Sequence, residues 1–208
     1  MNFYRTPFIF PLLYPQLTWH IPTQEKIIYL TFDDGPVPGT TEFVLDLLKK
    51  HNGQATFFCI GDNVLRNPEV FKKIREGNHV IGNHTFNHLK GWKFSTKEYV
   101  ENTIKCAEVI GKENLLFRPP YGRITRSQIR ALNDQKIIMW DVLTHDYLAS
   151  LSGQKCLQGS IAATRPGSIV VFHDSHKAEK NMMYALPRYM DHFMNLGFKF
   201  KSISVHGA

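Results

Sequence analysis

The chain has 208 residues, of which 43% are hydrophobic and 12% are aromatic, and it carries a formal net charge of +7. This length is enough to bury a sizeable core, and we expect one main domain. Lysine and arginine are scattered along the chain without a run of five or six basic residues, which argues against nucleic acid as a partner.

The N-terminal stretch "RTPFIFPLLYPQL" places an apolar run after a basic residue, as a signal peptide does. However, Pro7, Pro11 and Pro15 interrupt the run, and no small-residue cleavage site follows it. We therefore expect residues 1–25 to form an arm packed on a domain that spans residues 26–208. No stretch of eighteen apolar residues occurs, so no transmembrane span is expected. We expect a cytoplasmic monomer; a non-cleaved membrane-associating segment and a cell-envelope location are the alternatives.

Seven apolar, β-rich runs recur along the chain and predict strands. They cover residues 26–32, 55–60, 79–81, 115–118, 136–142, 168–172 and 198–202.

Helical signals lie between these runs. Residues 41–50 carry apolar side chains at helical spacing, and Asn67-Pro68 predicts a helix start that Gly77 ends. Ser95 and Glu98 match a capping box that opens a helix to Ile110, and residues 182–196 predict a last helix. Strand and helix thus alternate, which predicts an α/β fold with a parallel sheet, either open and doubly wound or closed as a barrel.

The side chains that look reactive follow the ends of the predicted strands. In barrels and open α/β sheets, the carboxyl ends of parallel strands meet on one face, and that face holds the active site. Residues that are far apart in sequence are therefore expected to share one pocket. These residues are Asp33, Asp34, His84, His88, Arg118, Asp146 and His173.

Two histidines and one carboxylate among them form the ligand set of an open metal site. His84 and His88 are four residues apart in "NHTFNH", and Asp34 adds the carboxylate. Alone, a pair of this spacing is more often a surface feature, and "DDG" alone is more often an Asx turn. Together they predict a divalent cation, with Zn²⁺ first and Co²⁺, Mn²⁺ or Ni²⁺ compatible. Only one aspartate needs to be a ligand, so the other is free to act as a base.

Five motifs carry a resemblance to a known family. They are "TFDDG" at 31–35, "HTFNH" at 84–88, "RPPYG" at 118–122, "WDVLTHDY" at 140–147 and "VVFHD" at 170–174. From about Lys26 onward the chain resembles the polysaccharide deacetylases of carbohydrate esterase family 4, metal-dependent enzymes that remove N- or O-acetyl groups from glycans. The resemblance implies a distorted (β/α) barrel, TIM-barrel-like, with about seven parallel strands.

The resemblance also implies roles for the residues that match these motifs. Asp33 would be the general base, and Asp34, His84 and His88 would hold the metal. Arg118 would hold the Asp33 carboxylate, and the backbone N–H of Tyr121 would face the oxyanion. His173 would be the general acid, with Asp146 as the partner that orients it and raises its pKa. The substrate-binding residues would be Pro119, Pro120, Tyr121, Trp140, Tyr147 and Val171.

The chain departs from the family pattern at three positions that concern substrate contacts. Leu143 stands where an aspartate is common, Tyr147 where a tryptophan is common, and Val171 where a leucine is usual. His145 adjoins Asp146, but strand alternation would point it to the opposite side, so His173 is preferred as the acid. The polar turn that contains Lys177 is assigned to solvent, with a contact at the rim of the site left open.

The leading hypothesis is an enzyme that removes N-acetyl groups from N-acetylhexosamine-containing glycans, such as peptidoglycan or a chitin-like oligomer. An O-acetyl esterase acting on xylan-type glycans, or a small C–N bond hydrolase of the same fold, is the alternative within the enzymes. A non-catalytic glycan-binding protein is the alternative from another class. Asp33, Arg118, Asp146 and His173 argue against the last, because binding alone requires none of them.

Overall fold

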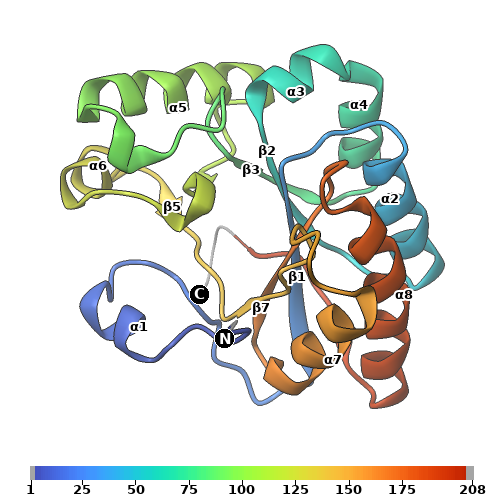
Figure 1. Ribbon diagram of the computed structural model, residues 1–208. Helices are drawn as coiled ribbons and strands as arrows, with labels where there is room; N and C mark the ends of the chain where they lie inside the picture. Colours follow the sequence, from blue (N-terminus) through green and yellow to red (C-terminus); the bar gives the residue numbers. More distant parts are fainter. Residues whose placement is uncertain (1–2, 205–208) are drawn as a thin grey trace.

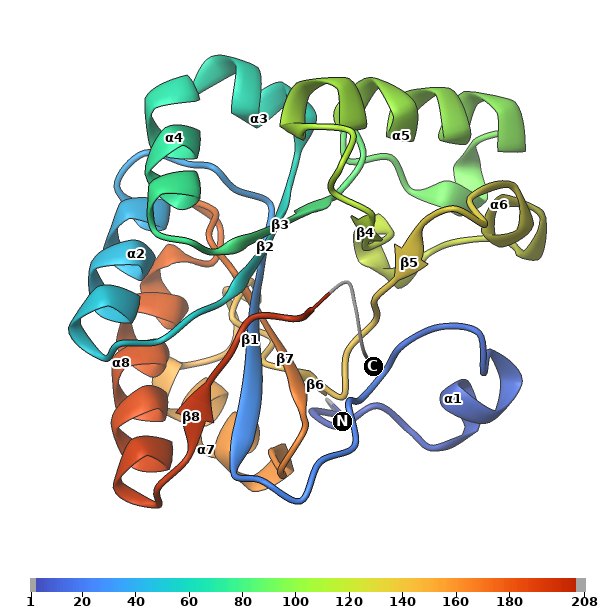
Figure 2. The same cartoon turned by 180° about the vertical axis from the view of Figure 1, so that it is seen from behind.

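A computed structural model describes residues 3–204 of the chain, and every pairing between the named strands of its sheet is parallel. The strands run in the order β5-β4-β3-β2-β1-β7-β6, and β8 pairs with β1 off this path. The strands are β1 (Ile27–Asp33), β2 (Thr56–Cys59), β3 (Val80–Asn83), β4 (Leu116–Phe117), β5 (Lys136–Ile137), β6 (Val142–Leu143), β7 (Ile169–His173) and β8 (Lys199–Phe200). The sheet curls into an incomplete barrel (Figures 1 and 2). The predicted α/β class and distorted barrel are confirmed.

Except for the short α1 on the N-terminal arm, the helices of the described residues surround the sheet on its outer side (Figures 1 and 2). The helices are α1 (Ile9–Leu13), α2 (Thr40–Lys50), α3 (Gly61–Arg66), α4 (Pro68–Glu76), α5 (Thr96–Ile110), α6 (Arg126–Ala131), α7 (Gly153–Ala163) and α8 (Glu179–Asn195), with 3₁₀ turns η1 (Gly91–Lys93) and η2 (Pro120–Gly122). The sequence patterns predicted α2, α4, α5 and α8 but missed the other four.

Local capping explains the starts of two predicted helices. At α5 the Glu98 backbone N–H donates to Ser95 Oγ, and the Ser95 backbone N–H donates to Glu98 Oε2, so the predicted capping box is confirmed. At α4, Pro68 opens the helix as predicted, but the Asn67 side chain makes no capping bond. Its amide instead donates to the carbonyl oxygens of Pro36 and Asn63, which ties α4 to the loop after β1.

The sequence pattern predicted one strand over residues 136–142, and this prediction is wrong. The run forms two short strands, β5 and β6, at opposite ends of the sheet order. Two backbone carbonyls between β5 and β6 accept hydrogen bonds from a buried side chain. Nε of Arg118 donates to the Ile138 carbonyl over 3.1 Å, and its second terminal nitrogen donates to the Met139 carbonyl over 2.8 Å. The segment therefore crosses from one edge of the sheet to the other on the open side of the barrel.

The N-terminal arm lies along this crossing segment. Arg5 forms an antiparallel bridge with Val142, and Thr18 forms a parallel bridge with Ile138. The short helix α1 between them leaves Phe8 and Leu12 exposed by 83% and 69%. Residues 1–2 of the expected arm and 205–208 of the expected domain lie outside the described residues. Within residues 3–204, no helix is long and apolar enough to cross a membrane.

Candidate active site

Strand register brings the predicted residues to one end of the barrel. The Cα of Asp33, the last residue of β1, is paired with His173, the last residue of β7. Asn83 of β3 is paired with Phe117 of β4, so the residues that follow them, His84 and Arg118, are neighbours as well. The predicted convergence at the carboxyl ends of the strands is therefore what the structure shows.

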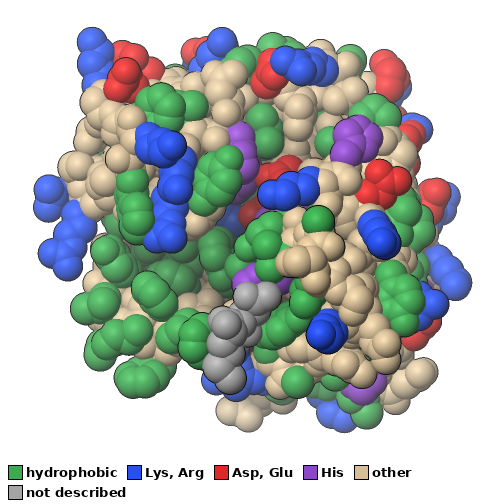
Figure 3. Space-filling model, viewed as in Figure 1, with side chains coloured by type: hydrophobic (Ala, Val, Ile, Leu, Met, Phe, Trp, Pro, Cys, Tyr) green, Lys and Arg blue, Asp and Glu red, His purple; other side chains and the backbone are tan. Residues whose placement is uncertain are grey.

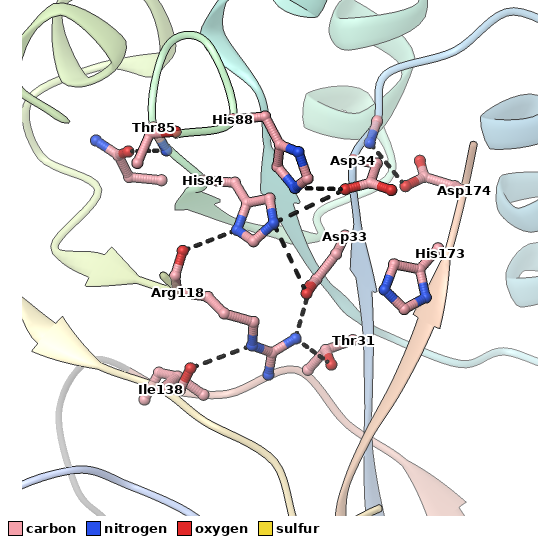
Figure 4. Close-up of polar contacts among 12 residues, drawn as sticks. Thr31, Asp33, Asp34, His84, Thr85, His88, Arg118, Ile138, His173 and Asp174 are labelled. Carbon is pink, nitrogen blue, oxygen red and sulfur yellow. Dashed lines mark hydrogen bonds and ion pairs between the residues drawn. The ribbon is translucent and has the colours of Figure 1, made fainter. Parts of the chain in front are cut away.

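Asp34, His84 and His88 form a compact set of potential metal ligands. Oδ1 of Asp34 lies 3.3 Å from His88 Nε2 and 3.8 Å from His84 Nε2, and the three ligand atoms lie within 4.8 Å of one another (Figure 4). His84 Nδ1 lies 2.8 Å from the Arg118 carbonyl oxygen, which can only accept, so Nδ1 carries the proton and Nε2 keeps its lone pair for a ligand.

The protonation of the two histidines fits a metal site. Burial is the main reason that the pKa of His84 lies well below its ordinary value, and the nearby His88 lowers it further. Burial also lowers the pKa of His88, although Asp34 opposes this. Two neutral imidazoles and one carboxylate suit a zinc-type divalent cation, while several first-row metals accept the same donors.

Unusual backbone angles cluster around this site. Within residues 3–204, seven non-glycine residues have positive φ. Five of these lie at the site end of the barrel: Asp34, Thr85, His88, Tyr121 and His145, with φ between 55 and 85°. Non-glycine residues adopt this region rarely and at a cost in free energy, and such residues cluster at functional sites. The site is therefore held in a geometry that the surrounding fold enforces.

Asp33 has one oxygen held by arginine and the other facing the ligand set. Arg118 is fully buried, and one of its terminal nitrogens donates to Asp33 Oδ1 over 2.7 Å (Figure 4). The same nitrogen donates to Thr31 Oγ1, also over 2.7 Å, and the guanidinium stacks 4.1 Å from the Phe58 ring centroid. Asp33 Oδ2 lies 4.0 Å from His84 Nε2, and this oxygen is left to act on a reactant.

His173 is paired with a buried carboxylate. Its Nδ1–H donates to Asp146 Oδ1 over 2.7 Å, and its backbone N–H donates to Asp146 Oδ2 over 2.7 Å. Burial lowers the pKa of His173, but the charge and hydrogen bond of Asp146, with Asp34 and Asp33, outweigh it and raise the pKa to about 9. At neutral pH the His173 imidazole is therefore protonated on both ring nitrogens. It lies on the β7 side of the two aspartates (Figure 4).

His145 points away from this pair, for a reason other than the one expected. It does not lie on a strand, because β6 ends at Leu143 and His145 has a φ of 58°. Its Nε2 lies 3.1 Å from the Phe3 carbonyl oxygen, and its ring packs edge-on against Tyr4. The left-handed backbone of His145, rather than alternation along a strand, turns its side chain away from that of Asp146.

These side chains open into a cavity of about 590 Å³. It is lined by Asp33, Asp34, Ile60, Asn63, His84, His88, Lys90, Tyr121, Arg123, Trp140, Leu143, Tyr147, Val171, His173, Ser175 and Lys177. Four of the six predicted substrate contacts are among them, including Trp140 and Tyr147. Pro119 and Pro120 are buried and do not line the cavity. A larger hollow of about 980 Å³ at the N-terminal arm shares no residue with this one.

Asp174 is a supporting residue that the sequence reasoning missed. It is fully buried, and its carboxylate accepts from the Gly35 backbone N–H over 3.0 Å and from the Thr41 hydroxyl over 2.6 Å. A Cβ on Gly35 would lie 2.0 Å from this carboxylate, so only glycine permits the contact. Burial raises the pKa of Asp174 to about 8. The carboxyl group ties the turn after Asp34 to the end of β7; the "HD" pair at a strand end was the available signal.

Comparison with known proteins agrees with this geometry. The polysaccharide deacetylase family model matches residues 20–140. The chain belongs to the polysaccharide deacetylase family. As a deacetylase of this metal-dependent family, it is a hydrolase that acts on glycans, and the resemblance drawn from the five motifs is confirmed.

The relatives of this deacetylase include bacterial cell-wall enzymes. A peptidoglycan-N-acetylglucosamine deacetylase of Bacillus cereus is 36% identical over 196 residues, which are 90% of this chain and 91% of that protein. A crystal structure of a peptidoglycan N-acetylglucosamine deacetylase with a bound naphthalenyl benzamide has a TM-score of 0.86 at 30% identity, with 95% of each chain covered. A pseudoenzyme of the same family from Bacillus anthracis has a TM-score of 0.79 at 26% identity; 89% of this chain and 66% of that longer chain are covered.

Proposed function

We propose that this deacetylase removes N-acetyl groups from N-acetylhexosamine-containing glycans, with peptidoglycan first and chitin-like oligomers second. The observation that carries the proposal is one cavity that holds three potential metal ligands together with two separately paired groups. These groups are Asp33, held by Arg118, and His173, held by Asp146. The names of the relatives, peptidoglycan deacetylases above all, support the substrate class.

Asp34, His84 and His88 would hold the divalent cation, with Zn²⁺ expected and Co²⁺, Mn²⁺ or Ni²⁺ compatible. When bound, such a cation acts as a Lewis acid that polarises the acetyl carbonyl and lowers the pKa of a water molecule.

The chain's own residues supply the remaining steps. Asp33 takes a proton from the attacking water, and Arg118 orients the Asp33 carboxylate through its hydrogen bond to Oδ1. The water oxygen bonds to the acetyl carbon, and the Tyr121 backbone N–H donates to the developing oxyanion. The C–N bond then breaks as His173 gives its Nε2 proton to the leaving amine, so the products are acetate and a free amino sugar. Trp140 and Tyr147 provide aromatic walls for the sugar, while Val171 and Leu143 shelter the acetyl methyl.

Metal removal tests the proposal directly. Zn²⁺-loaded protein is expected to release acetate from peptidoglycan fragments or chitooligosaccharides, to lose this activity with a chelator, and to regain it with added Zn²⁺. His84→Ala is expected to remove both metal binding and activity, since one of three ligands is gone. If acetylated sugars of every kind stay intact with metal present, the proposal is wrong.

If the protein is an O-acetyl esterase, its activity should depend less on His173. An alcohol leaving group needs less protonation than an amine, so His173→Gln should slow amide hydrolysis far more than ester hydrolysis. The comparison uses acetylated xylan and chitotetraose with both forms of the protein. A wild-type enzyme that releases acetate only from the xylan would favour the esterase.

The pseudoenzyme among the structural neighbours supports the non-catalytic alternative, because that protein has the same fold and is called a pseudoenzyme. The two buried pairs favour catalysis in this chain. Burying the Asp33 carboxylate and the Asp146 carboxylate is costly, and binding of a neutral sugar would not require either.

The pKa of His173 predicts the basic limb of the pH profile. A general acid must carry its proton, so activity is retained below its pKa of about 9 and lost as the pH rises past this value. Asp146→Asn removes the charge that raises this pKa, so the limb of kcat/KM is expected to move to lower pH. An unchanged limb in the Asp146→Asn variant would remove His173 from the role of acid.

For the location of the deacetylase, the exposed face of α1 supports the membrane-associated alternative. The chain from residue 6 to residue 24 contains no Asp, Glu, Lys or Arg, and Phe8, Leu12 and Leu13 are exposed there. The Arg126 guanidinium lies 5.9 Å from the Tyr14 ring beside this face, and the net charge is +7. Apolar side chains with neighbouring cations suit the interface of an anionic bilayer.

Vesicle sedimentation tests this location. The protein is expected to sediment with phosphatidylglycerol vesicles, and Phe8→Ser with Leu12→Ser is expected to release it. Leu65→Ser is the matched control, because Leu65 is 59% exposed on α3, outside this face. Equal sedimentation of all three proteins, or an effect on self-association alone, would refute membrane association.

A further inference from the structure

We propose that the cavity selects glycans that carry an anionic group, a carboxylate or a phosphate, close to the N-acetylated sugar. This inference rests on the proposed function and narrows its substrate class. Three cationic side chains, Lys90, Arg123 and Lys177, line the same cavity as Asp33 and the metal ligand set. None of them belongs to the motifs that carry the chemistry.

The charges deeper in the cavity are already balanced. Asp33 is neutralised by Arg118, its partner at 2.7 Å. Asp34 faces His84 and His88, and its single negative charge would be more than offset by the divalent cation that this set would hold. Neither Asp33 nor Asp34, the acidic residues that line the cavity, is therefore available as an ion-pair partner for the cations at its rim.

The rim cations also lack acidic partners of their own. Across residues 3–204, neither Lys90, Arg123 nor Lys177 forms a salt bridge with a carboxylate. Lys72, Lys73 and Lys97, by contrast, each pair with a glutamate. Three unpaired cations around one cavity produce a positive potential at its mouth, which attracts anions and opposes cations.

Aromatic rings position these cations on both walls. Lys90 Nζ lies 5.8 Å from the Tyr121 ring centroid on one wall, and Lys177 Nζ lies 5.4 Å from the Tyr147 centroid on the other. The Arg123 guanidinium lies 4.1 Å from the centroid of Trp92. Figure 3 shows blue side chains bordering the hollow in which purple histidines and red acids are visible.

This arrangement fits a charged sugar better than a neutral one. A sugar ring can stack on Tyr121 or Tyr147, and a carboxylate or phosphate on it or on the next sugar then lies within reach of the ammonium beside that ring. Lys90 is only partly exposed, so salt screens its charge less than that of a free surface lysine. A neutral glycan gains the stacking but none of the charge attraction.

The test compares oligosaccharides that differ in one charge. The first is an N-acetylglucosamine and N-acetylmuramic acid tetrasaccharide with free lactyl carboxylates, and the second is its methyl ester. A chitotetraose with and without a 6-phosphate separates phosphate from carboxylate. Turnover is measured by acetate release and binding by calorimetry, at low and high salt, so the charge preference is read even if no acetate forms.

The wild type is expected to prefer an anionic form over its neutral partner by about tenfold in kcat/KM or affinity at low salt, with the preference shrinking at high salt. In the Lys90→Gln, Lys177→Gln double variant the ratio should fall towards one. Lys50→Gln, an exposed lysine of α2 outside the cavity, should keep the wild-type ratio. Equal use of charged and neutral forms by the wild type would overturn this inference and leave the deacetylase proposal intact. Absence of acetate release from all four would count against the deacetylase proposal alone.

Discussion

Asp33→Asn is expected to lower kcat/KM by about 10²–10⁴-fold, the range typical of a lost general base. The amide has the shape of the carboxylate, and its oxygen can still accept from Arg118, so the fold should survive. Asp34, His84 and His88 are untouched, so metal binding should survive too. The measurement pairs acetate-release kinetics with metal content after gel filtration.

A matched control is Asp141→Asn. Asp141 is also a buried carboxylate in an arginine pair, with Arg165 at 3.2 Å, but it lies outside the catalytic cavity. This variant should lose some stability and keep its activity. Full activity in Asp33→Asn would remove Asp33 from the role of base, and loss of metal would show that Asp33 acts as a ligand.

Arg118→Met is expected to produce the largest loss of stability, about 3–5 kcal/mol in the free energy of unfolding, as when one partner of a buried ion pair is removed. The buried guanidinium donates to Asp33, Thr31 and the carbonyls of Ile138 and Met139. Methionine fills the space but leaves these acceptors without a donor. Activity should fall as well, because the base loses the group that orients it. Urea unfolding and acetate release measure the two effects.

Two further variants serve as comparisons for Arg118→Met. Arg118→Lys restores one positive charge but cannot reach four acceptors, so it should recover only part of the stability. Arg165→Met removes an arginine whose side chain is 51% exposed, and solvent screening makes the expected loss smaller, about 1 kcal/mol or less. If Arg118→Met unfolds at the same urea concentration as the wild type, the guanidinium does not hold the crossing segment.

The fold could be predicted where the local pattern and the tertiary environment agree. β1 and α5 show this, since the apolar run and the capping box each appear where expected. α6 was missed although Thr125 and Gln128 form a capping box, because the helix is only six residues long. α7 was missed because Gly153 and Gly159 weaken its helical pattern, and packing on α8 stabilises it.

The residues of the candidate site likewise divide into those that the sequence predicted and those that it did not. Seven reactive residues were placed at strand ends by sequence, and register brings them together. The partners that support them, such as Asp174 on the Gly35 turn, were not predicted. Lys177 was assigned to solvent with a contact at the rim left open, and it lines the cavity. Whether a polar surface residue faces a cavity depends on loop geometry, which has no periodicity to read.

The sequence by itself determined the donor types, their spacing and their positions after strands, and these were enough to indicate a polysaccharide deacetylase. Positions after strands did not say which group pairs with which: the resemblance implied the pairs, and the tertiary structure shows Asp33 with Arg118, Asp34 with the two histidines, and His173 with Asp146. The physical reason is that these pairings depend on strand order and register. Left-handed residues such as Asp34 and His88 then aim the side chains, and only long-range packing stabilises that backbone.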